Sequence, residues 1–127
     1  MKKPGHLVFV VDDRTVVAES LAMVLVQAGF RAIAFDDPLI ALSAASLKHP
    51  DALITDVIMP RMTGIDLALR VKNAHPECLI LLYSGQIRTT DFLEQARKQG
   101  HEFEILAKPV HPEVILERLR HLPGAEN

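Results

Sequence analysis

The sequence has little cysteine, no long apolar run and almost no net charge, and each shortage excludes a class of protein. Its one cysteine, Cys78, cannot form an internal disulfide, which suits a reducing compartment. No stretch approaches the roughly 18 apolar residues of a membrane span, and the N-terminal run 7–11 is too short for a signal peptide. A net charge of −2 offers no basic field that would attract nucleic acid. We therefore expect a soluble, cytoplasmic protein that binds neither membrane nor nucleic acid.

The length of 127 residues favours a single domain, 1–127, with an ordinary globular composition of 49% apolar and 24% charged residues. Short apolar runs alternate with longer stretches of helical periodicity. Such alternation predicts an α/β protein with a doubly wound, five-stranded parallel sheet and five helices. The predicted strands are 7–11, 31–35, 52–55, 79–83 and 103–106. The predicted helices are 14–28, from Asp36 or Asp37 to about Leu47, 64–74, from Thr89 or Thr90 to Gln99, and 112–121.

Reactive side chains follow four of the five predicted strands. In parallel α/β sheets, ligands bind outside the carboxyl ends of the strands. Asp12 and Asp13 follow the first strand, and Asp56 follows the third. Ser84 follows the fourth strand, and Lys108 comes just after the fifth. Three carboxylates, a hydroxyl and an ammonium are thus expected at one edge of the sheet.

The three carboxylates need a countercharge. Two carboxylates about 4 Å apart repel by about 4 kcal/mol at an effective dielectric constant of about 20, and Lys108 alone cannot neutralise three. Oxygen ligands with no histidine or cysteine nearby in sequence favour Mg²⁺ over zinc. A carboxylate held there can form an aspartyl phosphate, whose oxygens the metal, Lys108 and Ser84 would stabilise. The pattern therefore predicts that Asp56 is phosphorylated.

Four motifs together resemble a known family. FVVDD, LITDVIMPRMTG, LLYSG and LAKP occur in this order, each at a strand tip. They resemble the receiver domain of two-component response regulators over about residues 6–122. The resemblance implies a flavodoxin-like fold with strand order 2-1-3-4-5. It also implies a phosphoryl acceptor rather than an enzyme, loaded on Asp56 by a phosphohistidine and losing its phosphate only slowly by itself.

The resemblance also assigns the metal ligands. Asp13, Asp56 and the backbone carbonyl of Ile58 correspond to the Mg²⁺ ligands of the family, and Asp12 corresponds to an acid that acts mainly through water. Lys108 matches the phosphate-binding lysine of the family. These assignments imply Mg²⁺ as the cofactor.

The resemblance implies two partners. A histidine kinase or phosphotransfer protein would meet the first helix and the loops of the site, and an unidentified output protein would meet the surface of helix four, strand five and helix five. Met23 and Val26 extend the apolar surface of the first helix, either as the edge of the core or as a docking surface. Ser84 matches the switch hydroxyl, and the peptide bond between Lys108 and Pro109 is expected to be cis.

The sequence departs from the family pattern at the switch. The family often has an acid where Arg14 follows the paired aspartates, and it usually has an aromatic residue where Ile105 stands. The stretch 84–108 is slightly longer than usual, so Phe103 is a second candidate for the aromatic role. These departures affect the expected switch and leave the expected phosphorylation unchanged.

Simpler interpretations of the same residues stay open. The paired aspartates could cap the first helix, and Asp56 could be a turn acid. Ser84-Gly85 alone reads as a turn, and Lys108 alone reads as a solvated lysine. Cys78 is expected to be a core or edge thiol without a redox role. The histidines show no close metal-ligand pairing and are expected at the surface; they are His6, His49, His75, His101, His111 and His121.

Other functions fit the sequence less well than a signalling module does. An aspartyl-phosphate hydrolase tends to place a general acid two residues beyond its nucleophile, where this chain has Ile58. A flavin-binding protein needs a loop rich in Ser, Thr and Gly after its first strand, where this chain has acids. A detached N-terminal receiver of a DNA-binding regulator is a further alternative. Since the sequence stops soon after the last predicted helix, we expect the module to act by binding a partner or by passing its phosphate onward.

Overall fold

The computed structural model describes residues 5–85, 94 and 96–123, and a five-stranded sheet lies at its centre. The strands lie in the order β2-β1-β3-β4-β5, and every neighbouring pair is parallel. The predicted doubly wound topology is therefore confirmed. The strands are β1 (Leu7–Val11), β2 (Arg31–Phe35), β3 (Ala52–Asp56), β4 (Leu79–Ser84) and β5 (Glu104–Ala107).

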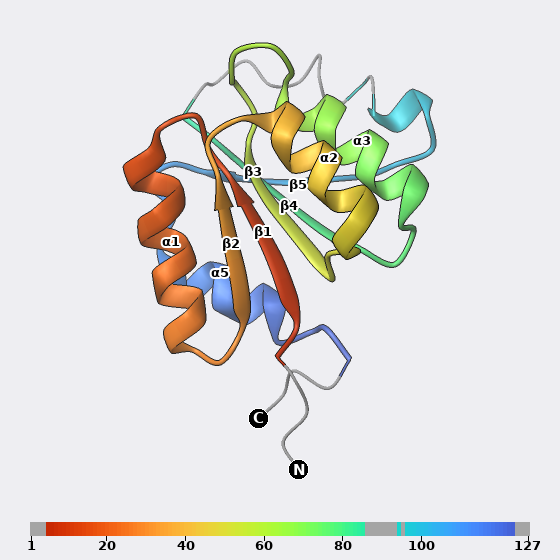
Figure 1. The fold of residues 1–127 in the computed structure, drawn as a ribbon. Coiled ribbons are helices and arrows are strands. Elements are labelled where there is room, and N and C mark those ends of the chain that lie inside the picture. The colour runs from red at the N-terminus through yellow and green to blue at the C-terminus, as the bar shows by residue number, and fades with distance from the viewer. Residues whose placement is uncertain (1–4, 86–93, 95, 124–127) are drawn as a thin grey trace.

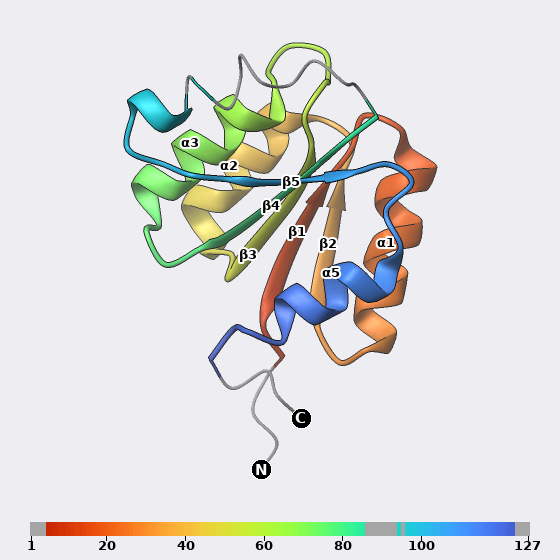
Figure 2. The same ribbon diagram turned by 180° about the vertical axis from the view of Figure 1, so that it is seen from behind.

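Helices cover both faces of the sheet. Helices α2 and α3 lie on one face, and α1 and α5 lie on the other, as Figures 1 and 2 show from opposite sides. Their bounds are α1 (Thr15–Gln27), α2 (Pro38–Lys48), α3 (Gly64–Ala74) and α5 (Pro112–Leu119). The predicted fourth helix lies partly outside the described residues; in that segment, residues 94 and 96–98 are helical. None of the helices in the described part of the chain is long and apolar enough to cross a membrane.

The central strands are buried on both faces, which explains their unbroken apolar runs. Every residue of β1 and β3 is buried. On the side of α2 and α3, Phe9 and Leu53 lie in one apolar cluster. On the side of α1 and α5, Val10 and Ile54 lie in a second cluster, together with Leu119 of α5. Two apolar layers therefore hold the strand ends in fixed positions.

Local signals set the element boundaries close to those predicted. Asp37 caps α2, because its carboxylate accepts the N–H of Leu39. Strand β5 begins one residue later than predicted, and α5 ends at Leu119 rather than at His121. Gly64 opens α3 where a Cβ atom would collide with the carbonyl oxygen of Asp56. A glycine at this position thus lets the loop after β3 fold back tightly on the strand end.

The amino edge of the sheet brings together two histidines that lie far apart in the sequence. The Nδ1 atoms of His49 and His75 lie 3.1 Å apart, and their rings meet edge to face. These residues are the C-caps of α2 and α3, which pack against each other. His49 is exposed, whereas His75 is half-buried.

Cys78 is a free, buried thiol, and burial raises its pKa to about 12.

Candidate functional site

Three carboxylates meet at the carboxyl edge of the sheet. Asp12 follows β1 directly, and Asp56 is the last residue of the neighbouring strand β3. One oxygen each from Asp12, Asp13 and Asp56 lies within 4.8 Å of the others. Asp12 and Asp56 are buried, whereas Asp13 is exposed. The sheet thus brings together the acids that follow its first and third strands, as the sequence predicts.

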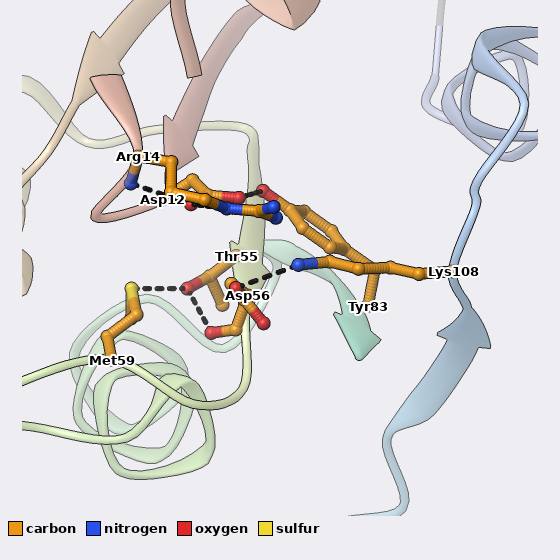
Figure 3. Close-up of polar contacts among 7 residues, drawn as sticks. All are labelled: Asp12, Arg14, Thr55, Asp56, Met59, Tyr83 and Lys108. Atoms are coloured by element: carbon orange, nitrogen blue, oxygen red, sulfur yellow. Dashed lines mark hydrogen bonds and ion pairs between the residues drawn. The ribbon is translucent and has the colours of Figure 1, made fainter. Parts of the chain in front are cut away.

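Lys108 reaches this cluster from the end of β5. Its Nζ lies 3.0 Å from Oδ2 of Asp56, in a partly buried ion pair (Figure 3). The backbone N–H of Lys108 donates to the carbonyl of Ser84 at 3.0 Å, which anchors the lysine to the end of β4. The peptide bond from Lys108 to Pro109 is cis, as predicted. One ammonium therefore faces three carboxylates, and the countercharge on Asp56 comes from the lysine that the sequence singles out.

Asp12 is held by two neighbours that the sequence analysis did not assign to it. The backbone N–H of Arg14 donates to Oδ1 of Asp12 at 2.9 Å, and Nε of Arg14 lies 3.5 Å from the same oxygen. The hydroxyl of Tyr83 donates to Oδ2 of Asp12 at 2.7 Å. The N-cap residue of α1 is Arg14, whose side chain does not cap the helix, and the first turn holds no acid. The interpretation of the paired aspartates as helix caps was therefore wrong.

Tyr83 contacts both Asp12 and Lys108. Its ring is buried in β4, and Nζ of Lys108 lies 5.0 Å from the ring centre. Burial raises the pKa of Tyr83 far above its ordinary value, and the hydrogen bond to Asp12 raises it further. The phenol therefore stays a neutral hydrogen-bond donor. The signal for this role is the tyrosine in the apolar run LILLY, since a buried phenol needs a polar partner.

Two hydroxyl groups lie at the ends of the central strands. Ser84 is the last residue of β4 and is buried. It lies one residue beyond Tyr83, which pairs with Asp56 across the two strands. The hydroxyl of Thr55 donates to the carbonyl of Asp56 at 2.9 Å. Ile58 follows in the loop after β3 with a side chain that is 42% exposed, and the ligand role of its carbonyl stays a prediction.

The donor set of the cluster fits a hard divalent cation. Among the described residues, the three aspartates of this cluster have carboxylate oxygens that lie close enough together to share one ion. Its members are all carboxylates, and oxygen ligands suit Mg²⁺ better than they suit zinc. Lys108 supplies a positive charge to Asp56 and Arg14 supplies one to Asp12, so a bound cation would offset the negative charge that remains on the three carboxylates. The site therefore fits the Mg²⁺ that the sequence predicts.

A groove between α1 and α5 adjoins the carboxylates. It has a volume of about 610 Å³, and its lining includes Arg14, Val17, Leu21, Tyr83, Lys108 and Ile115. Beyond it, α1 carries Met23 and Val26, which are 62% and 54% exposed. The interpretation of these two residues as the edge of the core was therefore wrong. They lie toward the end of α1 that is remote from the carboxylates, where Val26 lines a second groove with Leu7 and Phe30.

The two candidates for the switch residue lie on the same side of the sheet. Ile105 pairs with Leu82 across β4 and β5, and both Ile105 and Phe103 pack against the cluster beneath α2 and α3. Phe103 precedes β5, and its ring stacks on that of His101 with centroids 5.7 Å apart. Both side chains are half-buried. The role of either residue in switching stays a prediction.

Comparisons with known proteins agree with this geometry. The family model described as the response regulator receiver domain matches residues 8–120. The probable transcriptional regulatory protein TcrX of Mycobacterium tuberculosis is 30% identical over 115 residues, which are 91% of this chain and 48% of that protein. The DNA-binding transcriptional regulator NtrC of Escherichia coli is 32% identical over 103 residues, which are 81% of this chain and 22% of that protein.

A solved structure supports the same relationship. The chemotaxis protein CheY4 of Vibrio cholerae superposes with a TM-score of 0.79 at 26% identity. The superposition covers 93% of this chain and 98% of that chain. In contrast, the chain spans half or less of the length of the two curated relatives.

Proposed function

The chain belongs to the family of response regulator receiver domains, and on this premise we propose that it accepts a phosphoryl group on Asp56. The observation that carries the proposal is the position of the Asp56 carboxylate. Asp56 is buried, and its carboxylate lies 3.0 Å from the ammonium of Lys108 and close to two further carboxylates. A charge arrangement of this kind destabilises the resting site and suits the binding of a cation and a phosphoryl group.

In the proposed reaction, a carboxylate oxygen of Asp56 attacks the phosphorus of a phosphohistidine on a partner protein. The new O–P bond forms as the N–P bond breaks, and the leaving imidazole nitrogen keeps the electron pair. Lys108 already contacts Asp56 and would stabilise the phosphoryl oxygens. Asp13, Asp56 and the carbonyl of Ile58 would hold Mg²⁺, with Asp12 acting through water. The cation would supply neutralisation of the phosphoryl charge.

The fate of the phosphorylated chain follows from the same residues. Ile58 stands two residues beyond Asp56, where an aspartyl-phosphate hydrolase tends to carry its general acid. Its side chain has no group that could activate water, so we propose slow self-dephosphorylation and no catalytic turnover. The buried hydroxyl of Ser84 would contact the phosphoryl group and start the switch.

The proposed partners meet two different surfaces. The exposed surface of α1, with the groove that it forms with α5 and the loops of the site, would receive the histidine kinase or phosphotransfer protein. The surface that includes β5 and α5 would receive an output protein or pass the signal on through a phosphorelay. We place these interactions in the cytoplasm, where Cys78 would stay reduced.

Acetyl phosphate, a small phosphoryl donor, tests the proposed function. With Mg²⁺ present, we expect intact-mass spectrometry to show the mass of one phosphoryl group on the wild type and none on Asp56→Asn. Chelation of Mg²⁺ should prevent the gain on the wild type. Equal incorporation by both proteins would refute the assignment of Asp56.

A further inference from the structure

We propose that Tyr83 is a positioning residue of this site, whose hydroxyl holds Asp12 in competition with the hydration shell of a bound divalent cation. The inference rests on the proposed function, because it assumes that Asp12, Asp13 and Asp56 bind a cation. It adds a residue of β4 to the machinery and assigns it a direction of effect: Tyr83 weakens cation binding.

The first step is the geometry around Asp12. Its side chain is fully buried, and each of its oxygens already accepts a hydrogen bond from the protein. Oδ2 accepts from the hydroxyl of Tyr83 at 2.7 Å, and Oδ1 accepts from the N–H of Arg14 at 2.9 Å. Figure 3 shows the phenol pointing toward Asp12. Asp12 is therefore turned toward protein donors before any cation arrives.

The second step concerns the donors that a cation brings. Mg²⁺ usually keeps several of its waters when it binds a protein, and these waters donate hydrogen bonds to nearby carboxylates. In the wild type, Tyr83 already donates to Oδ2 of Asp12 before the cation arrives, so a water of the hydration shell can donate to this oxygen only in competition with the phenol. A hydrogen bond from a water of the hydration shell to that oxygen therefore adds little to the affinity for the cation.

Removal of the phenol hydroxyl changes this balance. In Tyr83→Phe, Oδ2 of Asp12 would be a buried, charged acceptor without this donor, which is costly in the cation-free protein. A water of the hydration shell can replace the lost donor once the cation is bound. Binding then relieves a cost that the wild type does not have, so the affinity for Mg²⁺ rises.

The third step links the same ring to Lys108 and to the groove. Nζ of Lys108 lies 5.0 Å from the ring centre, and the ring lines the groove between α1 and α5. A change in the hydrogen bond to Asp12 therefore alters the surroundings of the ring itself. Tyr83 is the only tyrosine of the chain, which has no tryptophan. Its fluorescence is thus a direct signal from the site.

The test measures Mg²⁺ affinity by titration calorimetry in the wild type, Tyr83→Phe and Thr55→Val. We expect Tyr83→Phe to bind Mg²⁺ about three- to tenfold more tightly than the wild type. Thr55→Val is the matched control, because it also removes a buried hydroxyl, but one that donates to the carbonyl of Asp56. Its affinity should stay that of the wild type. Equal or weaker binding by Tyr83→Phe would overturn the proposal.

A second measurement uses the wild type alone and is independent of how well the variants fold. Addition of Mg²⁺ should change the fluorescence of Tyr83, with the same midpoint as the calorimetric titration. An unchanged signal in a protein that binds Mg²⁺ would overturn the role of Tyr83 and leave the proposed function standing. Absence of Mg²⁺ binding by the wild type would overturn both.

Discussion

The two ends of β3 carry aspartates with different tasks. Asp51 comes just before the strand, and its carboxylate accepts the N–H of Leu7 at 2.7 Å, while its backbone bonds to Leu7 and Leu79. Asp56 ends the strand beside two other carboxylates and Lys108. The acid at the amino edge makes hydrogen bonds to backbone groups at the strand ends. The acid at the carboxyl edge lies in a cluster of charged side chains that the fold does not need. Such an excess of like charge marks the functional edge.

Two lysines repeat this contrast. Nζ of Lys72 donates to the carbonyl of Cys78 at 2.6 Å and ties α3 to the start of β4. Nζ of Lys108 instead contacts the carboxylate of Asp56. The residue type is the same, but one ammonium satisfies a backbone group and the other balances an acid cluster. The partner of a charged side chain, rather than its type, therefore distinguishes a structural site from a functional one.

The largest effect is expected when Asp13 is replaced at the carboxyl edge. Asp13→Ala removes a proposed side-chain ligand, so the affinity for Mg²⁺ should fall by about tenfold to a hundredfold. Without Mg²⁺, the same variant should be as stable as the wild type or more stable, because one of three like charges is gone. Titration calorimetry and urea denaturation measure the two quantities. Unchanged affinity in Asp13→Ala would show that Asp13 is not a ligand.

The matched change at the amino edge should have the opposite pattern. Asp51→Ala leaves the buried N–H of Leu7 without its acceptor, and we expect the free energy of unfolding to fall by about 1–3 kcal/mol. The affinity for Mg²⁺ should stay that of the wild type, because Asp51 lies at the other end of β3. Urea denaturation and calorimetry on the same protein sample check both. A loss of Mg²⁺ affinity in Asp51→Ala would break the contrast between the two edges.

A smaller effect is expected at the start of β5, where the carboxylate of Glu104 accepts two hydrogen bonds from Arg118, both at 2.8 Å. The hydrogen bonds from Arg118, and then its charge, hold the pKa of Glu104 below its ordinary value of 4.5. The folded protein therefore binds this proton less readily than the unfolded chain does. The stabilisation is fully present above the ordinary pKa and is lost as the pH falls from that value through the lowered pKa of the folded state.

Arg118→Leu tests this pair. Its stability should lie slightly below that of the wild type at neutral pH, by less than the loss in Asp51→Ala, because the pair is solvent-exposed. The difference should shrink as the pH falls below the ordinary pKa of glutamate, and also at high salt. Urea denaturation at several pH values measures it. A difference that widens on acidification would contradict the assigned sign.

The smallest effect is expected in the coupling of the site to α5. Ile105 offers no aromatic ring, and its branched side chain has a restricted χ1, so no large rotamer change is available. Beryllofluoride, a mimic of the phosphoryl group, should therefore shift NMR signals strongly near Asp56 and Ser84 and only weakly along α5. Shifts across α5 as large as those near Asp56 would show that Phe103 or another residue transmits the signal.

The features that were predictable from the sequence follow from periodicity and topology. Apolar runs and helical stripes indicated the strands and helices. Parallel strands place their following residues at one edge of the sheet, so the sequence alone was enough to group Asp12, Asp56 and Lys108. Gly64 and the cis bond to Pro109 lie in motifs that the family resemblance covered. These features depend on local sequence and on strand order alone.

The contacts that the sequence did not predict join side chains from different helices and strands. Tyr83 and Asp12 are 71 positions apart, and a tyrosine in an apolar run reads as core. His49 and His75 meet because two helix ends pack side by side. Periodicity tells which face of an element a side chain occupies, but not which neighbour its polar atom reaches. Such contacts are set by the packing of whole elements against one another.

Mapping the phosphorylated residue in the wild type tests the assignment of Asp56 as the phosphoryl acceptor. Borohydride reduces an aspartyl phosphate to homoserine, which peptide mass spectrometry can locate after treatment with acetyl phosphate and Mg²⁺. We expect homoserine at position 56 and an unmodified aspartate at positions 12, 13 and 51. Homoserine at position 51, or at position 12 or 13 with Asp56 unmodified, would contradict the assignment of Asp56 as the phosphoryl acceptor.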